Sequence, residues 1–429
     1  MIEQLYQKYV TCNYNVCTDT RNITKNSLFF ALKGASFDGN KFAKEAIEKG
    51  AKYAVIDNAA YSIEGKTILV KDVLSSLQLL ANYHRKQFDI PFIGITGSNG
   101  KTTSKELIGC VLETSFKTLI TKGNLNNHIG VPLTLLCLRK EHEIAIIEMG
   151  ANHPLEIKEL STIAAPNYGI ITNIGMAHIE GFGSFEGVKK TKKELYDYIQ
   201  ENGGTIFYNN DDSILSSIVP GNATLISYGQ KGSSISGTIT DSSPFISFSW
   251  TTQSYQSNAI SSHLIGEYNF YNFLLAICIG KFFKIEAEKI NKALSNYQPT
   301  NNRSQVKKTK NNTVIMDCYN ANPTSVLAAL ESFKGVNKEN KIAILGDMLE
   351  LGNISQNEHQ KVCDFLKENN IDAITVGEEF NKAKHLYKNF KSVDLLIDYL
   401  INKPFTSCFI LLKGSRGIQL EKLIETNTL

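Results

Sequence analysis

The sequence has no apolar run long enough to cross a bilayer, since the longest candidate, Phe270 to Phe283, is interrupted by Asn272 and Lys281. A membrane-spanning helix needs about 20 apolar residues. The first residues, Met1 to Gln7, also lack the basic stretch and apolar centre of a signal peptide. We therefore expect no membrane span and a cytoplasmic location.

An excess of either charge is also missing. The 45 basic and 42 acidic residues leave a net charge of +3. This small charge does not indicate nucleic acid or an anionic membrane as a partner. The eight cysteines show no metal-ligand spacing. We expect them to be free thiols in a reducing compartment. Internal repeats and low-complexity tracts are absent as well.

What the sequence does contain is a succession of short apolar strands and helical patterns. With 429 residues the chain is too long for one core, so several domains are expected. Alternating strands and helices predict an α/β protein of three domains. Residues 1–86 form a small N-terminal α/β domain. Residues 87–300 form a central parallel-sheet ATPase domain built on a phosphate-binding loop (P-loop), with an antiparallel β addition predicted from the Ser/Thr-rich stretch 231–262. Residues 301–429 form a Rossmann-like, doubly wound C-terminal domain.

The phosphate-binding loop follows the apolar run Phe92 to Ile95. Glycines let backbone N–H groups surround an anion, and the N-terminus of the following helix adds partial positive charge. Lys101 can reach the terminal phosphates of a nucleotide and the Thr102 hydroxyl can ligate Mg²⁺. The loop is shorter than usual, because Ile95 stands where the first glycine is expected. The residues predicted to bind ATP or GTP are Gly97, Ser98, Asn99, Gly100, Lys101, Thr102 and Thr103.

Two further residues lie at or shortly after the ends of apolar strands of the central domain. Glu148 is followed by Met149-Gly150, and a carboxylate there meets nucleotide-bound Mg²⁺. His178 follows the run that begins at Thr172. As a hard ion Mg²⁺ rarely takes a His ligand, so His178 stays open between a structural and a ligand role.

Several polar clusters also allow two interpretations. Each one either binds polar groups of a ligand or only shapes a turn. The same choice applies to two charged pairs at strand ends, Asp19 with Arg21 and Lys33 with Asp38, which either bind a ligand or form salt bridges in surface turns. The run Lys189 to Lys193 is by default a solvated helix face. The other clusters are Asn124, Asn126 and Asn127; Asp317, Asn320 and Asn322; and Lys413, Ser415 and Arg416, whose two cations suit a carboxylate or phosphate.

Taken together, these motifs resemble the Mur ligase family over essentially the whole chain. The family forms amide bonds in peptidoglycan precursors at the expense of ATP. Two strings are typical of the member that adds D-alanyl-D-alanine, namely Tyr319-Asn320-Ala321-Asn322-Pro323 and the stretch from Gly346 to Gly352. The other matching stretches are Thr18 to Arg21, Gly97 to Thr103, Gly123 to Asn127, Glu148 to Gly150, Ala177 to Ser184 and Lys413 to Arg416.

The resemblance implies the substrates and the reaction. The first domain would bind the UDP end of UDP-N-acetylmuramoyl-tripeptide through Thr18, Asp19, Thr20 and Arg21. ATP would convert the tripeptide carboxylate into an acyl phosphate, and D-Ala-D-Ala would capture it. The amide loop of Asn124, Asn126 and Asn127 would serve the same substrates, and Asn320, Asn322, Lys413, Ser415 and Arg416 would hold the dipeptide. We expect a monomer.

The resemblance also implies the cofactor ligands. ATP would be contacted by Asn269, Asn272, Arg303 and Asp317 besides the loop, and two Mg²⁺ would be held by Thr102, Glu148, His178 and Lys192. Lys192 aligns with a lysine that many members carbamylate. With Lys101, Glu148 and His178 it would form the catalytic set. One departure is Tyr268, where the family usually has His.

Two alternatives remain at this stage. One is another amide ligase of the superfamily, either one that adds a single amino acid or one like folylpolyglutamate synthetase. The other is a nucleotide-driven switch that hydrolyses ATP without a joined product.

Overall fold

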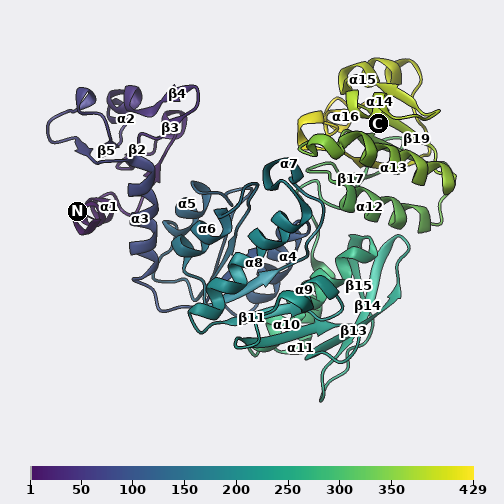
Figure 1. Cartoon of the computed structure of the whole chain (residues 1–429), viewed down its shortest axis with the longest axis horizontal. Coiled ribbons are helices and arrows are strands. Elements are labelled where there is room, and N and C mark those ends of the chain that lie inside the picture. The colour runs from purple at the N-terminus through teal and green to yellow at the C-terminus, as the bar shows by residue number, and fades with distance from the viewer. Residues whose placement is uncertain (1) are drawn as a thin grey trace.

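The chain folds around three successive sheets, each covered by helices (Figure 1). The computed structural model describes residues 2–429. In the view of Figure 1 the N-terminal unit lies on the left, the C-terminal unit at the upper right, and the central unit between and below them. The predicted α/β fold of three units is confirmed, while the domain limits after residues 86 and 300 stay predictions.

The first sheet has four parallel strands in the order β1-β2-β5-β6. Its strands are β1 (Val16–Cys17), β2 (Leu28–Phe30), β5 (Tyr53–Ile56) and β6 (Thr67–Leu69), and a separate hairpin pairs β3 (Lys33–Gly34) with β4 (Phe37–Asp38). The helices are α1 (Ile2–Thr11), α2 (Ala43–Glu48) and α3 (Val73–Arg85).

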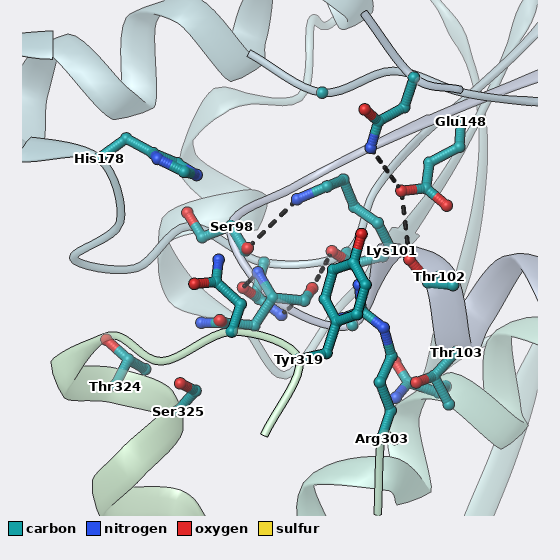
Figure 2. Close-up of a pocket in the computed structure, with 18 of the residues that line it drawn as sticks. Ser98, Lys101, Thr102, Thr103, Glu148, His178, Arg303, Tyr319, Thr324 and Ser325 are labelled. Carbon is teal, nitrogen blue, oxygen red and sulfur yellow. Dashed lines mark hydrogen bonds between the residues drawn. The ribbon is translucent and has the colours of Figure 1, made fainter. Parts of the chain in front are cut away.

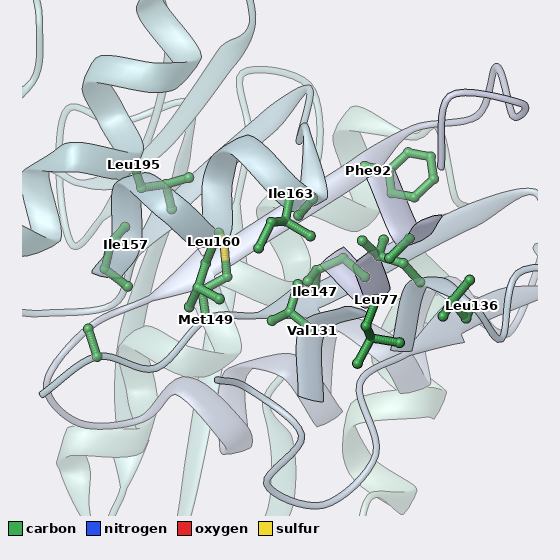
Figure 3. Packing of buried hydrophobic residues seen from close by; sticks show 14 of the residues in the cluster. Leu77, Phe92, Val131, Leu136, Ile147, Met149, Ile157, Leu160, Ile163 and Leu195 are labelled. Carbon is green, nitrogen blue, oxygen red and sulfur yellow. The ribbon is translucent and has the colours of Figure 1, made fainter. Parts of the chain in front are cut away.

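Helix α3 fixes the first unit to the second. Leu77 of α3 is fully buried in a cluster that continues through Val131 and Ile147 of the central unit (Figure 3). At the end of α3, the Arg85 guanidinium donates to the carbonyls of Ala164 and Ala165 and lies 3.6 Å from the centre of the Phe92 ring. The N-terminal and central units therefore share one apolar core.

The neighbouring His84 makes this junction sensitive to acid. Its ring is 1% exposed and its Nε2 lies 3.1 Å from the Leu138 carbonyl oxygen. Burial lowers the pKa of His84 to about 4. The pKa of His84 in the folded protein lies below that of an unfolded histidine, which is about 6.5. The stability contributed by the neutral ring is therefore fully present above pH 6.5 and is lost as the pH falls toward 4.

We expect this histidine to remove about 3 kcal/mol of unfolding free energy between pH 6.5 and pH 4. Urea unfolding across that range measures the loss. His84→Gln, which stays neutral, should flatten the dependence by that amount, whereas His263→Gln at an exposed site should leave it unchanged. Equal pH dependence in both variants would show that His84 is not responsible.

The second sheet has nine strands in the order β15-β14-β13-β12-β11-β10-β7-β9-β8. Strands β7 to β12 run parallel: β7 (Phe92–Thr96), β8 (Thr118–Ile120), β9 (Ile144–Glu148), β10 (Tyr168–Ile171), β11 (Thr205–Asn209) and β12 (Thr224–Gly229). Strands β13 (Ile235–Asp241), β14 (Phe245–Thr251) and β15 (Ile260–Ile265) pair antiparallel with one another, which confirms the predicted β addition.

Helices cover both faces of this sheet. They are α4 (Lys101–Leu112), α5 (Gly130–Leu135), α6 (Glu156–Ala164), α7 (Ile179–Phe182), α8 (Phe185–Glu201), α9 (Ser213–Ile218), α10 (Phe270–Phe282) and α11 (Ala287–Asn296). The apolar run from Phe270 forms α10, which is buried from Phe270 to Gly280 except at Tyr271. None of the helices within residues 2–429 is long and apolar enough to span a membrane.

The third sheet has six strands in the order β16-β17-β21-β18-β19-β20, and only β16 is antiparallel to its neighbour. The strands are β16 (Gln305–Lys308), β17 (Thr313–Asp317), β18 (Lys341–Gly346), β19 (Ala373–Val376), β20 (Lys388–Phe390) and β21 (Phe409–Lys413). The helices are α12 (Pro323–Gly335), α13 (Ser355–Glu368), α14 (Glu378–Lys382), α15 (Val393–Asn402) and α16 (Lys422–Glu425). The carboxyl ends of β17 and β21 place Asp317 and Lys413 at one edge, where α/β sheets bind ligands.

Candidate functional site

The glycine loop lies between β7 and α4, at the carboxyl edge of the central sheet. Gly97 and Gly100 have φ angles of 144° and 79°, which favour glycine. A Cβ atom on Gly97 would lie 2.0 Å from the Thr172 hydroxyl oxygen, so the close approach of strand β10's end excludes any side chain there.

Lys101 begins α4 and turns back over this loop (Figure 2). Its ammonium donates to the carbonyl oxygens of Gly97 (2.6 Å) and Ser98 (3.3 Å). Within residues 2–429 no carboxylate oxygen lies within 4.0 Å of it. Burial lowers the pKa of Lys101 to about 8. An anion delivered by a ligand would give this partly buried cation the partner that the protein does not supply.

Glu148 at the end of β9 is buried beside the loop, with 1% of its side chain exposed. Its Oε1 accepts hydrogen bonds from the Thr102 hydroxyl (3.2 Å) and the Asn126 amide (2.8 Å). Its Oε2 lies 3.3 Å from the Lys105 ammonium, but accepts no hydrogen bond. Burial raises the pKa of Glu148, and the charges of Lys105 and Lys101 outweigh that effect, so the net shift is downward. The carboxylate is therefore ionised next to the Thr102 hydroxyl.

Across the cavity, the C-terminal unit contributes two guanidinium groups around one ring. The Arg303 guanidinium carbon lies 4.0 Å from the centre of the Tyr319 ring, and that of Arg416 lies 5.4 Å from it. The buried Nε of Arg303 has no hydrogen-bond partner in the described part of the chain. Figure 2 shows Arg303 and Tyr319 entering the same space as Lys101 and Thr102.

These residues line one cavity of about 930 Å³ between the central and C-terminal units. It brings together most of the residues that the sequence singled out. They are Ser98, Asn99, Gly100, Lys101, Thr102, Thr103, Asn124, Asn126, Asn127, Glu148, His178, Asn269, Asn272, Arg303, Asp317, Asn320, Lys413 and Arg416.

Several predicted ligand residues already bind other protein groups. Asn322 caps α12, and its amide nitrogen donates to the Asn99 side-chain oxygen at 2.7 Å. Lys413 pairs with Asp317 at 3.0 Å, and the Ser415 hydroxyl accepts from the Leu349 backbone. These contacts hold the C-terminal loops in place and join them to the phosphate-binding loop.

Asn269 immediately precedes α10, and Asn272 lies in its first turn. The Asn272 amide nitrogen donates to the Asn269 side-chain oxygen (2.9 Å), and its oxygen accepts from the Ser104 hydroxyl (2.9 Å). The unusual Tyr268 places its hydroxyl 2.8 Å from that of Ser304, at the entry to the C-terminal unit. This network joins α10, α4 and the connection between the units.

His178 lies at the boundary of the central and C-terminal units. Its backbone is left-handed, with φ 53°, and its Nδ1 is hydrogen-bonded to the Glu350 carboxylate of the C-terminal unit. Burial lowers the pKa of His178, although Glu350 acts in the opposite direction. In this arrangement His178 joins two units, and Glu350 is a partner that we had not singled out from the sequence.

Lys192 corrects one expectation. The run from Lys189 to Lys193 was expected to be a solvated helix face, yet the Lys192 side chain is 1% exposed. Helix α8 packs against α6 and β10, and this packing turns Lys192 inward. Its ammonium is 3.4 Å from the Ala151 carbonyl oxygen, and no carboxylate of residues 2–429 lies within 4.0 Å. Burial lowers the pKa of Lys192 well below the usual lysine value, and the positive charge of Lys101 lowers it further.

The N-terminal cluster lies outside this cavity. Thr18, Asp19, Thr20 and Arg21 follow β1, and Arg21 pairs with Asp19 at 2.6 Å with 85% of its own side chain exposed. None of the four lines the cavity. Lys33 pairs with Asp57 at 2.8 Å rather than with Asp38. The Asp38 carboxylate instead accepts a hydrogen bond from the Asn40 backbone N–H.

Sequence reasoning missed Lys105, Glu350 and Asn99's contact with Asn322. Lys105 follows Lys101 by one helical turn, so spacing could have placed it on the same face of α4, but not beside Glu148 of the distant strand β9. Nothing in the local pattern around Glu350 or Asn322 indicates their partners.

A glycine loop at the edge of a parallel sheet, a buried carboxylate beside its threonine and a facing α/β unit define a P-loop nucleotide-binding enzyme. Three family models match the chain: "Mur ligase family, catalytic domain" over residues 14–86, "Mur ligase middle domain" over 95–280, and "Mur ligase, glutamate ligase domain" over 302–415. The chain belongs to the Mur ligase family.

Similar proteins include two named UDP-N-acetylmuramoyl-tripeptide--D-alanyl-D-alanine ligase. The Bacillus subtilis protein is 34% identical, covering 97% of this chain and 93% of the relative, and the Escherichia coli protein is 32% identical, covering 95% and 92%. A crystal structure of MurF from Acinetobacter baumannii has a TM-score of 0.88 at 32% identity, covering 96% and 93%. MurF ligase from Thermotoga maritima, in complex with ADP, has a TM-score of 0.86 over 97% and 98%, and at 24% identity this likeness bears on the fold alone.

Proposed function

We propose that this chain joins D-alanyl-D-alanine to the tripeptide carboxylate of UDP-N-acetylmuramoyl-tripeptide, with ATP converted to ADP and phosphate. The observation that carries the proposal is that one cavity is lined by Lys101 and Glu148 of the central unit and by Arg303 and Arg416 of the C-terminal unit. The near full-length relatives named for this reaction support the choice of substrates.

The residues present fit a nucleotide with magnesium. The loop from Gly97 to Thr103 would hold the phosphates, and Asn269, Asn272, Arg303 and Asp317 line the rest of the space. The Nε of Arg303, which has no hydrogen-bond partner among residues 2–429, suits an anion, and the ionised Glu148 carboxylate beside the Thr102 hydroxyl suits a hard cation. No group of three or more His, Cys, Asp or Glu side chains within residues 2–429 could hold a metal alone.

Thr102 and Glu148 would therefore hold one Mg²⁺ together with phosphate oxygens, and His178 and Lys192 would serve a second. Bound Mg²⁺ supplies charge neutralisation at the phosphates. His178 would serve that second ion through its Nε2, while its Nδ1 stays hydrogen-bonded to the Glu350 carboxylate.

The chemistry follows from the poor reactivity of a carboxylate. An amine cannot displace oxide from it, so one carboxylate oxygen first bonds to the γ-phosphorus and ADP leaves. The dipeptide amine then bonds to the acyl carbon, loses a proton, and phosphate leaves with that oxygen. The first step brings two anions together, and Lys101 offsets this repulsion. Water would hydrolyse the acyl phosphate, so we expect the C-terminal unit to close over the cavity before the chemistry.

The substrate would enter from the N-terminal unit. Thr18, Asp19, Thr20 and Arg21 would bind the uridine diphosphate, and the sugar and peptide would extend into the cavity. Asn124, Asn126 and Asn127 line its central wall and Asn320, Lys413 and Arg416 its C-terminal wall. Asn322 and Ser415 would act by holding that wall. We also propose a cytoplasmic monomer, and sedimentation velocity would test its oligomeric state.

Lys192 is proposed to be carbamylated. Its buried amine is shifted toward the neutral form, and a neutral amine adds CO₂ to give a carbamate anion and a proton. We expect a carbamate resonance in ¹³C NMR after equilibration with ¹³C-bicarbonate. It should vanish in Lys192→Ala and persist in Lys193→Ala, where Lys193 is partly exposed and paired with Asp197. An unchanged spectrum in Lys192→Ala would rule this out.

A substrate screen tests the proposed function against its alternatives. ADP release is measured with UDP-N-acetylmuramoyl-tripeptide and either D-Ala-D-Ala or single amino acids, including glutamate with a folate. We expect release only with the dipeptide, and dependence on both substrates. Release with a single amino acid would favour another amide ligase, and release without any acceptor would favour a nucleotide switch.

A further inference from the structure

Lys105 is a buried cation whose partner belongs to the proposed metal site. It lies on α4 one turn beyond Lys101, with 2% of its side chain exposed. Its ammonium is 3.3 Å from Glu148 Oε2, and Glu148 is the only acidic residue among those described that pairs with it.

Stability does not explain this pair. Removing two charges from water is so unfavourable that apolar side chains of similar size often serve a core equally well. Orientation does not explain it either. The other carboxylate oxygen already accepts from Thr102 and Asn126, and the Glu148 backbone N–H donates to the Thr121 hydroxyl. What Lys105 adds to this site is one positive charge.

We propose that Lys105 is the resident counter-ion of Glu148, which prevents a divalent cation from binding there until a nucleotide arrives. Without nucleotide the site offers one hydroxyl and a carboxylate whose charge is already compensated. A nucleotide brings several negative charges, and only then does the total charge favour Mg²⁺. Lys105 thus acts through the charge of Glu148 and does not itself bind the cation. The proposal rests on the proposed function in taking Thr102 and Glu148 as the metal ligands.

The test uses the full-length, nucleotide-free protein and Mn²⁺, whose binding is measured by electron paramagnetic resonance. We expect weak binding to the wild type and binding at least about tenfold tighter to Lys105→Met, because a nearby positive charge has been removed from a site of low dielectric. Lys122→Met makes the same change at an exposed lysine and should leave Mn²⁺ binding unaltered. Lys105→Arg keeps the charge and should bind as weakly as the wild type.

Two further variants separate charge from structure. In Lys105→Met combined with Glu148→Gln, the tightening should disappear if Lys105 acts through Glu148. Lys105→Gln removes the charge but keeps a polar group, and it gives the same readout if the methionine variant does not fold. Mn²⁺ binding to the charge-removed variants no tighter than to the wild type would overturn the proposal. If the wild type does not join the dipeptide to the tripeptide, the proposed function is wrong, but the comparison of Mn²⁺ binding between the wild type and the Lys105 variants remains valid.

Discussion

Replacing Lys101 by alanine is expected to abolish ATP-dependent ligation and leave the fold intact. The ammonium is held over the loop by the carbonyls of Gly97 and Ser98, where the phosphates of a nucleotide would lie. Removing such a charge-stabilising group lowers turnover by a factor on the order of 10²–10³ or more. Since Lys101 pairs with no carboxylate, its removal leaves no buried charge without a partner.

Phosphate release in the presence of all three substrates measures the effect, and circular dichroism checks the fold. Lys117→Ala, at an exposed lysine just past α4, is the matched control and should keep wild-type turnover. Substantial residual turnover in folded Lys101→Ala would mean that the loop does not bind the reacting phosphate.

The second large effect is expected for Glu148→Gln. This change keeps the shape of the side chain and removes the charge that faces Lys105 at 3.3 Å. We expect turnover to fall by a factor on the order of 10² or more and the magnesium concentration at half-maximal rate to rise. Because Lys105 loses its buried partner, the variant should also lose about 3–5 kcal/mol of unfolding free energy.

Magnesium titrations of phosphate release and urea unfolding measure the two effects separately. Glu141→Gln, at an exposed carboxylate close to the start of β9, should change neither. Wild-type magnesium dependence in Glu148→Gln would remove Glu148 from the metal site.

Local structure could be predicted closely from the sequence because strand and helix patterns are local. The apolar run from Phe92 to Ile95 lies in β7, and Glu148, predicted to end an apolar strand, is the last residue of β9. The Ser/Thr-rich stretch 231–262 located the antiparallel part of the central sheet. The order of the loop, its preceding strand and its following helix was predictable for the same reason.

Contacts between distant segments could not be predicted in this way. His178 and Glu350 are 172 residues apart, and Asn99 and Asn322 are 223 apart, so no periodicity records their pairing. The five-residue run around Lys192 could not show which lysine faces inward, because that depends on the packing of α8 against α6 and β10. Asn126 was predicted to bind a ligand. Its amide also donates a hydrogen bond to Glu148, a contact that the local sequence pattern does not indicate.

The most direct test of the account follows oxygen from the tripeptide carboxylate. With ¹⁸O in that carboxylate, ATP and D-Ala-D-Ala, mass spectrometry should find one ¹⁸O in the released phosphate and the other in the new amide of the UDP-linked pentapeptide. Unlabelled phosphate, or ADP formed without pentapeptide, would contradict activation of the carboxylate by the nucleotide bound at Lys101.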